Sequence, residues 1–232
     1  MCMKDREIFS NILTTTPFIL RLDGRSFHNW SKNVGYLKPY DKTLFNAMTE
    51  TAKALIANSG LNASFAYTFS DEINIYINSD PFGRRIEKLD SIAAGYTSSV
   101  FTLLSHSPVP VAFDSRVIPI ESTQIPSYFA WRQKEAWKNH VNGYAYKILI
   151  DSGLSNVDAQ QKLNGLKINE IHELTYSHGL NLANTPTWQR RGTAIYRVSD
   201  PKTKSNSYII DTELPLFKTK EGTKWIYNHI FE

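Results

Sequence analysis

Cysteine is nearly absent from this chain of 232 residues, since Cys2 is the only one. An intramolecular disulfide and a cysteine-based zinc site are therefore excluded, and a reducing compartment is favoured. No apolar run approaches the length of a membrane span. The start of the chain carries Asp5 and Glu7, where a signal peptide would have an unbroken apolar region. We expect an intracellular protein that does not enter a membrane, located in the cytoplasm, with an organellar site left open.

Strong charge of one sign is also lacking. The chain has 26 Lys and Arg against 22 Asp and Glu, a net charge of +4. This balance permits a polyanionic partner without requiring one. The six histidines show no zinc-binding spacing.

Two acidic signatures each follow an apolar, β-favouring run: Leu22-Asp23-Gly24-Arg25 and Phe69-Ser70-Asp71-Glu72. If the two strands are neighbours, the Asp23 and Asp71 carboxylates converge with the Gly24 carbonyl at one sheet edge. Such hard oxygen ligands suit Mg²⁺ that holds a nucleoside triphosphate. The alternative is that both are turn residues, because Asp-Gly and Ser-Asp are common in turns and caps. Strand alternation places Glu72 on the opposite face from Asp71, as a supporting or salt-bridging residue.

The order of elements in the first half predicts a sheet domain. Asp41 caps a helix that ends near Gly60, residues 65–77 form a hairpin around Ser70 and Asp71, and a second helix runs over residues 86–103. A fourth strand over 109–118 is expected to be interrupted at Asp114 and Ser115. This βαββαβ order is that of the ferredoxin-like split βαβ unit, in which strands one and three are adjacent.

The second half predicts a helical appendage. Helices are expected over residues 128–150, 156–163 and 167–178, followed by a small hairpin over 192–198 and 207–210 with Asp200-Pro201-Lys202 in its turn. The predicted fold class is α+β. The predicted domains are a catalytic sheet domain over 1–124 and a helical and hairpin appendage over 125–232 that contacts RNA and nucleotide.

Cations near the acidic signatures are candidates for binding phosphates. Arg84, Arg85 and Lys88 are predicted on the first turns of the second helix, where the helix dipole disfavours cations. With Lys38 they could neutralise a triphosphate, and His28 follows Asp23 closely enough to share the pocket. The alternatives are a solvated basic face and a structural histidine.

Aromatic and basic residues interleave in the long helix. Trp131-Arg132-Gln133-Lys134 and Lys138-Asn139-His140 have the pattern of an RNA-contacting surface, and Arg190-Arg191 form a second basic loop. Arg132, Lys138, Asn139, Arg190 and Arg191 are the candidate RNA contacts. A buried helix with snorkelling cations is the alternative.

Six motifs occur in the order found in a known family: Arg21-Leu22-Asp23-Gly24-Arg25-Ser26-Phe27-His28, Lys38-Pro39 with Asp41, Tyr67-Thr68-Phe69-Ser70-Asp71-Glu72, Phe113-Asp114-Ser115-Arg116-Val117, Trp131-Arg132-Gln133, and Gly179-Leu180-Asn181 through Pro186 to Arg191-Gly192-Thr193. The chain resembles the tRNA(His) guanylyltransferases and their guanylyltransferase-like relatives, the 3′-to-5′ polymerases. The resemblance covers nearly the whole chain.

The resemblance implies a polymerase palm with catalytic residues Asp23, Asp71 and Glu72. Two Mg²⁺ ions would be held by Asp23, the Gly24 carbonyl and Asp71. The nucleotide-binding residues would be Arg25, Ser26, Phe27, His28, Lys38, Ser70, Arg84, Arg85 and Lys88. ATP or GTP would activate the tRNA 5′ phosphate, and the 3′-hydroxyl of an incoming nucleoside triphosphate would then attack it. The candidate RNA contacts would bind tRNA, and a homotetramer is also implied.

One stretch departs from the family pattern. Members that add guanosine to tRNA(His) carry His-Ile-Asn-Asn shortly after Trp-Arg-Gln, whereas this chain reads Trp137-Lys138-Asn139-His140. The departure favours the branch that repairs truncated tRNA 5′ ends by copying the opposite strand of the acceptor stem. The alternative is a dedicated tRNA(His) guanylyltransferase.

Two functions of other classes use similar structures. A nucleotide cyclase shares the two-carboxylate palm but has no use for the Trp131 helix or the Arg190-Arg191 loop. An RNA-binding module shares the βαββαβ topology but would carry stacking aromatics on its central strands, which here are aliphatic and acidic.

Overall fold

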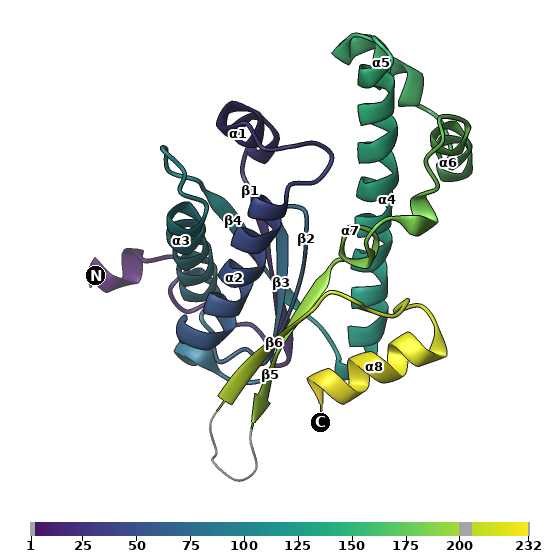
Figure 1. Ribbon diagram of the computed structural model, residues 1–232. Coiled ribbons are helices and arrows are strands. Elements are labelled where there is room, and N and C mark those ends of the chain that lie inside the picture. The colour runs from purple at the N-terminus through teal and green to yellow at the C-terminus, as the bar shows by residue number, and fades with distance from the viewer. Residues whose placement is uncertain (1–2, 200–205, 232) are drawn as a thin grey trace.

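The computed structural model describes residues 3–199 and 206–231. The described residues contain one six-stranded antiparallel sheet with the order β4-β1-β3-β2-β5-β6 (Figure 1). The strands are β1 (Phe18–Gly24), β2 (Phe65–Phe69), β3 (Glu72–Ile77), β4 (Phe113–Pro119), β5 (Thr193–Ser199) and β6 (Asn206–Asp211). The first four have the order of the predicted ferredoxin-like unit, so that prediction is confirmed. The predicted turn residues Asp200, Pro201 and Lys202 lie outside the described residues.

Alternating side chains of the strands build a core on each face of the sheet. Phe18, Leu20 and Leu22 pack on the side of α2 and α3, whereas Ile19 packs on the side of α4 and α8. Figure 1 shows the two pairs of helices on opposite sides of the sheet. These helices are α2 (Lys42–Asn58), α3 (Ile86–Leu104), α4 (Ile125–Asp151) and α8 (Lys220–Ile230).

Asp41 begins α2 as predicted. Its Oδ1 accepts hydrogen bonds from the amides of Thr43 and Leu44 at 2.7 and 3.1 Å, which satisfies donors that have no partner within the helix. A shorter helix, α1 (Phe27–Val34), precedes it and was not predicted. Its Phe27 and Trp30 pack against Phe101 of α3, which fixes α1 beside the end of β1.

Two strand predictions need correction. β4 is continuous from Phe113 to Pro119, because Asp114 and Ser115 pair with Asp23 and Leu22 of β1. As an edge strand, β4 can turn polar side chains toward solvent without breaking its ladder. The terminal hairpin is not separate from the sheet, since β5 pairs with β2 and extends it.

The remaining helices surround the far half of α4 (Figure 1). They are α5 (Asn156–Leu163), α6 (Ile168–Ser177) and α7 (Thr187–Arg191), together with the short 3-10 turn η4 (Leu182–Asn184). Three other 3-10 turns, η1 (Met3–Arg6), η2 (Pro81–Arg84) and η3 (Ser122–Gln124), lie elsewhere in the fold. Val141 and Ala145 of α4 form a third core with Ile171 and Leu182. Within the described ranges, none of the helices has the length and apolar character needed to span a bilayer.

Candidate active site

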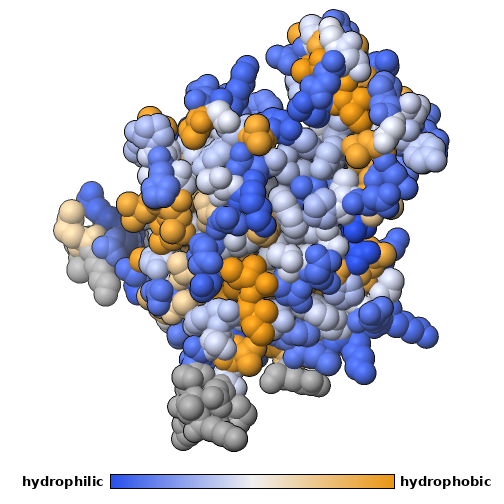
Figure 2. All heavy atoms as spheres, in the orientation of Figure 1, coloured by the Kyte–Doolittle hydropathy of each residue, from blue (hydrophilic) through white to orange (hydrophobic). Residues whose placement is uncertain are grey.

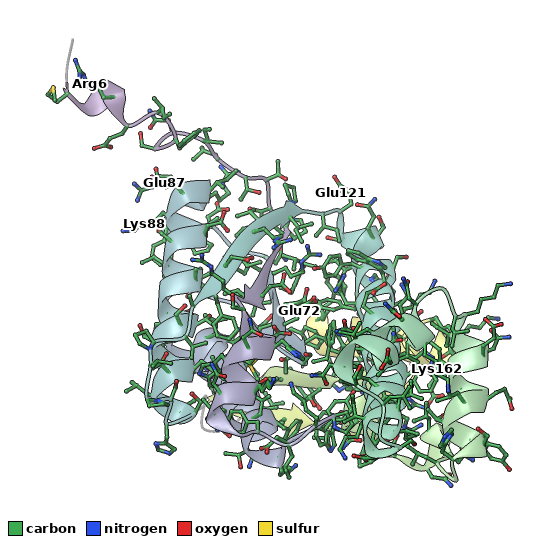
Figure 3. The ribbon with its side chains drawn as sticks, turned by 90° about the horizontal axis from the view of Figure 1, so that it is seen from above. Arg6, Glu72, Glu87, Lys88, Glu121 and Lys162 are labelled. Carbon is green, nitrogen blue, oxygen red and sulfur yellow. The ribbon has the colours of Figure 1, made fainter. Side chains whose placement is uncertain are left out.

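The two acidic signatures are neighbours at one end of the central strands. Asp23 lies opposite Glu72 in the β1–β3 pair, and the Gly24 N–H donates to the Asp71 carbonyl at 3.1 Å. Asp71 lies in the turn between β2 and β3, after Ser70, whose φ is 52°. In Figure 3, Glu72 marks this end near the middle of the view.

Asp71 is an acid with an unfavourable environment for its charge. Burial raises the pKa of its carboxyl, and repulsion from Asp23 adds to the rise. A hydrogen bond from the Ser70 hydroxyl at 3.0 Å and the nearby Lys38 ammonium partly offset these effects. A cation bound here would stabilise the ionised form.

Two arginines flank the carboxylate of Asp23. Oδ2 of Asp23 lies 3.6 Å from Nε of Arg21 and 3.5 Å from Nη2 of Arg116. Both arginines share the face of the sheet that Asp23 occupies, because Arg21 precedes it by two residues on β1 and Arg116 lies opposite Arg21 on β4. The strand alternation of Arg21 and Asp23 is the sequence signal that could have identified Arg21.

Gly24 allows a close approach between β1 and α1. A Cβ at this position would lie 2.2 Å from the Phe27 ring. The absence of a side chain therefore lets the strand end and the helix pack directly against each other.

Glu72 is held by a buried ion pair. Arg132 donates to it from Nε at 2.8 Å and from Nη2 at 2.6 Å, and the Asn74 amide donates at 2.7 Å. Tyr128 in turn donates to Asn74 at 2.6 Å. Glu72 and Arg132 are both buried, so Glu72 has the salt-bridging position expected from strand alternation. Arg132 is buried in this ion pair on the α4 side of the sheet, so the structure does not support its predicted contact with tRNA.

A cavity of about 220 Å³ opens beside Asp71. It lies between the α1–α2 loop, the β2–β3 turn, α4 and α7. Its polar lining includes His28, Lys38, Asp41, Ser70, Asp71 and Asn139. Burial lowers the pKa of Lys38, and Asp71 opposes that shift. Nζ of Lys38 donates to Ser31 of α1 at 2.9 Å.

Aromatic side chains form another wall of the cavity. The rings of Phe45 and Trp188 lie 4.2 Å apart, and Tyr40 is packed edge-on against Trp188. These rings offer a flat apolar surface to a nucleobase, while Lys38 offers a charge to phosphate.

A hydrogen-bond network behind this wall joins α4 to α7. The Tyr40 hydroxyl donates to the Gln189 carbonyl at 2.8 Å and lies 3.2 Å from Nδ1 of His140. Nε2 of His140 lies 3.1 Å from the Thr185 hydroxyl. Burial and the nearby Arg190 lower the pKa of His140 to about 4, so its ring is neutral near pH 7. His140 supports the cavity wall, whereas its neighbour Asn139 lines the cavity.

The donors at the acidic end fit magnesium. Asp23 and Asp71 supply carboxylates and Gly24 supplies a carbonyl, and hard oxygen atoms are the ligands that Mg²⁺ prefers. Repulsion between the two carboxylates, which contributes to the raised pKa of Asp71, is the interaction that a cation would relieve. Among the described side chains, no group of three or more His, Cys, Asp or Glu could hold a metal ion. The candidate set is therefore two side chains and a carbonyl.

Comparison with known proteins identifies the family. A family model described as tRNAHis guanylyltransferase matches residues 1–121, and one described as Thg1 C terminal domain matches residues 123–227. The probable tRNA(His) guanylyltransferase of Drosophila melanogaster is 30% identical over 209 residues, which are 84% of this chain and 72% of the relative. The Saccharomyces cerevisiae tRNA(His) guanylyltransferase is 28% identical over 205 residues, 82% of this chain and 86% of that protein.

The chain belongs to the tRNA(His) guanylyltransferase family. Solved structures of the family share its fold. A bacterial Thg1-like protein in complex with ATP has a TM-score of 0.81 and 25% identity, and the match covers 99% of this chain and 97% of that one. The same kind of bacterial protein in complex with GTP has a TM-score of 0.75 and 27% identity, with the same coverage.

Membership in the tRNA(His) guanylyltransferase family confirms two predictions. The polymerase-type palm is shared with the structural relatives, and the family is one of nucleotidyltransferases. Neither the cyclase nor the RNA-binding module is a member of this family.

Three predicted nucleotide contacts lie away from the site. Arg84, Arg85 and Lys88 follow the far end of β3, about 17 Å of extended strand beyond Glu72. Arg84 ends η2 and pairs with Asp80 at 3.4 Å, Arg85 precedes α3, and Lys88 is on its first turn. Figure 3 shows Lys88 on the outer end of α3, apart from Glu72. Within one chain, this arrangement does not support a nucleotide role for the three cations.

The predicted nucleotide contacts that follow Asp23 differ in their exposure and in their distance from the cavity. Arg25 and Ser26 are exposed, and Ser26 has a φ of 54° just before α1. Phe27 is buried against Trp30 at the edge of the cavity, and His28 is exposed beside it.

The remaining predicted tRNA contacts differ in accessibility. Lys138 pairs with Glu135 at 2.7 Å on the surface of α4. Arg190 donates to the Thr185 carbonyl at 2.9 Å and Arg191 to the Leu214 carbonyl at 2.7 Å, and both remain partly exposed. Tyr40 and Trp188 were missed as cavity residues, because an aromatic residue gives no sequence signal that separates a core from a pocket wall.

Proposed function

We propose that this chain adds nucleotides to the 5′ end of tRNA in the 3′-to-5′ direction, choosing each nucleotide by pairing with the opposite strand. The observation that carries the proposal is the cavity that places Asp71, Lys38 and a wall of aromatic rings together in a tRNA(His) guanylyltransferase family chain. The ATP and GTP complexes of bacterial structural relatives support nucleotide binding by this chain.

The proposed reaction has two phosphoryl transfers. An oxygen of the tRNA 5′ monophosphate attacks the α-phosphorus of ATP or GTP, and pyrophosphate leaves. The 3′-hydroxyl of the incoming nucleoside triphosphate then attacks the activated 5′ phosphorus, and the nucleoside monophosphate leaves. Both steps create charge on phosphate oxygens, so a site for them needs positive charge and fixed orientation.

Magnesium is part of the proposal. Two Mg²⁺ ions held by Asp23, the Gly24 carbonyl and Asp71 would supply charge neutralisation on phosphate and a lower pKa for the attacking hydroxyl. Lys38, His28 and Ser70 line the cavity and would bind the triphosphate. Glu72 and Arg132 would act indirectly. Their ion pair would hold the ends of the strands next to Asp23 and Asp71 in place.

The residues behind the cavity wall favour template-dependent addition over the dedicated addition of guanosine. Where dedicated guanylyltransferases carry His-Ile-Asn-Asn, this chain has His140 buried in the network that fixes Tyr40 and Thr185. A buried neutral ring leaves Asn139 to face the nucleotide, without a dedicated set of guanine-reading groups. The second candidate is addition of the extra 5′ guanosine to tRNA(His), which the names of the curated relatives favour.

A template exchange separates the two candidates. A 5′-monophosphorylated tRNA that lacks its first nucleotide is incubated with each nucleoside triphosphate and Mg²⁺. We expect G to be added opposite C and U opposite A, with addition ending when the acceptor stem is complete and no preference for tRNA(His). The Asp23→Ala variant is the control for contaminating activity. Addition of G opposite every base, or activity confined to full-length tRNA(His), would establish the dedicated guanylyltransferase instead.

We further propose that the chain assembles as a homotetramer in the cytoplasm and that residues 1–124 are the catalytic domain. Apolar side chains on the N-terminal segment support subunit contacts, since Ile8 and Phe9 are 74% and 57% exposed. Val198 and Ile209 add an exposed apolar patch on the terminal hairpin (Figure 2).

A further inference from the structure

A groove on the side of α4 opposite Asn139 combines aromatic rings with cations. It has a volume of about 770 Å³ and lies between α4, the start of α6, the end of α7 and the segment before α8. Figure 1 shows α6 and α7 beside this part of α4. The groove is separate from the nucleotide cavity, because α7 turns Trp188 and Gln189 toward the cavity and Arg190 and Arg191 toward the groove.

The aromatic rings of the groove are held in place before any ligand binds. Trp131 is 46% exposed, and the guanidinium of the buried Arg132 lies 4.3 Å from the centre of its ring. Trp137 is stacked on His140, with ring centres 5.5 Å apart and planes 24° from parallel. Fixed indoles lose little freedom when a base stacks on them.

The charges of the groove are all positive. Lys134, Arg190, Arg191 and Lys218 line it, and among the described residues no acidic side chain does. The two arginines are anchored through carbonyl groups of Thr185 and Leu214 and keep their charge at the surface. Cations beside exposed aromatic rings match the phosphates and bases of a single RNA strand, whose bases are free to stack.

One end of the groove adjoins the acidic site. The Arg21 guanidinium lies 5.8 Å from the centre of the Trp131 ring, and Arg21 is also paired with Asp23. An RNA strand that passes over Trp131 would therefore lead from the Asp23 and Asp71 carboxylates into the groove.

We propose that this groove binds the single-stranded 3′ end that extends beyond the acceptor stem of the substrate tRNA. The proposal rests on the proposed function, because it assumes that the 5′ end of the same stem lies at Asp23 and Asp71. Drawing the 3′ strand away over Trp131 would hold the stem end open for the incoming nucleotide. Arg132 acts here only by supporting the Trp131 ring.

Binding of two RNA stems tests the groove. One duplex carries a single-stranded 3′ extension, and the other has the same stem with a blunt end. We expect the parent protein to bind the extended stem at least about fivefold more tightly, a preference that one stacked base can supply. The Lys134→Glu, Lys218→Glu double variant should bind both stems equally and lower the salt slope for the extended stem by about 1 to 1.5. Lys224→Glu, which removes a cation on the exposed side of α8, should keep the preference.

Stacking is measured separately with 2-aminopurine in the 3′ extension. Its fluorescence should fall on binding to the parent and to Trp131→Phe, and much less on binding to Trp131→Ala. Equal binding of the two stems by the parent, or a preference unchanged in the double variant, would overturn the groove assignment. If those results come with normal nucleotide addition to tRNA, only the groove proposal fails. If tRNA is not extended at all, the proposed function fails.

Discussion

Asp71 shows how one residue can cost stability and still be required. Its pKa is raised in the folded chain, mainly by burial, so the folded state holds the proton more tightly than the unfolded state does. Above the folded pKa the carboxylate is ionised in both states, and its charge then destabilises the fold. Below the unfolded pKa it is protonated in both states, and the cost disappears.

We therefore expect Asp71→Asn to raise the free energy of unfolding at pH 7 in the absence of Mg²⁺, while it abolishes nucleotide addition. The gain should shrink as the pH falls through the folded pKa of Asp71 toward its unfolded value. Urea unfolding in a chelator at several pH values measures this. Glu87→Gln, which removes an exposed carboxylate near the start of α3, should give no such gain. A variant less stable than the parent at pH 7 would show that the Asp71 charge is already compensated.

Arg132 and Glu72 test whether the arginine of the Trp131-Arg132-Gln133 motif acts on RNA or on the fold. Arg132→Met leaves the Glu72 carboxylate buried without its partner, which should destabilise the chain by about 3 to 5 kcal/mol. Adding Glu72→Gln should recover part of that loss. Chemical unfolding of the four proteins of this double-mutant cycle measures the coupling. An Arg132→Met variant of parental stability with weak RNA binding would restore Arg132 as a tRNA contact.

At the scale of elements, the junction of β1 and α1 decides the shape of the cavity. β1 ends with the Asp23 and Gly24 pair, and α1 carries His28 and Ser31 to the cavity wall. Phe27 packs where a Cβ of residue 24 would lie. The position of α1 is thus set by the absence of a side chain on the strand.

Gly24→Ala should therefore displace α1 and lower nucleotide addition by at least about tenfold, since small displacements in an active site have such effects. Combining it with Phe27→Leu should restore part of the activity by making room for the methyl group. Gly95→Ala is the matched control: a Cβ there meets nothing within 4 Å, and α3 should gain up to about 1 kcal/mol. Steady-state kinetics and thermal unfolding separate the two effects. Unchanged activity in Gly24→Ala would mean that α1 does not fix the site.

At the scale of the whole molecule, the two halves of the sequence share one sheet. β5 completes the hydrogen bonding of β2, and α4 and α8 cover the face that carries Phe65, Tyr67 and Tyr76. All three side chains are at most 1% exposed. Removing the second half would expose this apolar face and an unpaired strand edge.

Residues 1–124 expressed alone should consequently fail to fold cooperatively, although they hold every element of the βαββαβ unit. Near-ultraviolet circular dichroism and thermal unfolding of the fragment should show no sharp transition, whereas the full chain should show one. A cooperative transition in the fragment would establish the first half as an independent domain.

Much of this architecture follows from local patterns in the sequence. Alternation along Phe18–Leu22 and Ile73–Ile77 predicts strands, Asp41 predicts a helix start, and the order of elements predicts that Asp23 and Asp71 meet. These features depend on contacts within a few residues and on the standard topology of a βαββαβ unit. The resemblance to the family motifs predicted the reaction and the roles of the metal-binding and nucleotide-binding residues.

Other features were decided only when distant segments met. From the sequence Arg132 was a candidate RNA contact and Glu72 a supporting or salt-bridging residue without an identified partner, and only the packing of α4 on the sheet paired the two. Arg84 and Lys88 follow the acidic hairpin in sequence, but β3 carries the chain to the opposite end of the sheet. The sequence by itself therefore determined most of the strands and long helices, their order and the acidic end. Only the tertiary structure decided which charges are buried and paired and which remain free for a ligand, because the energy of a charge depends on its neighbours in space.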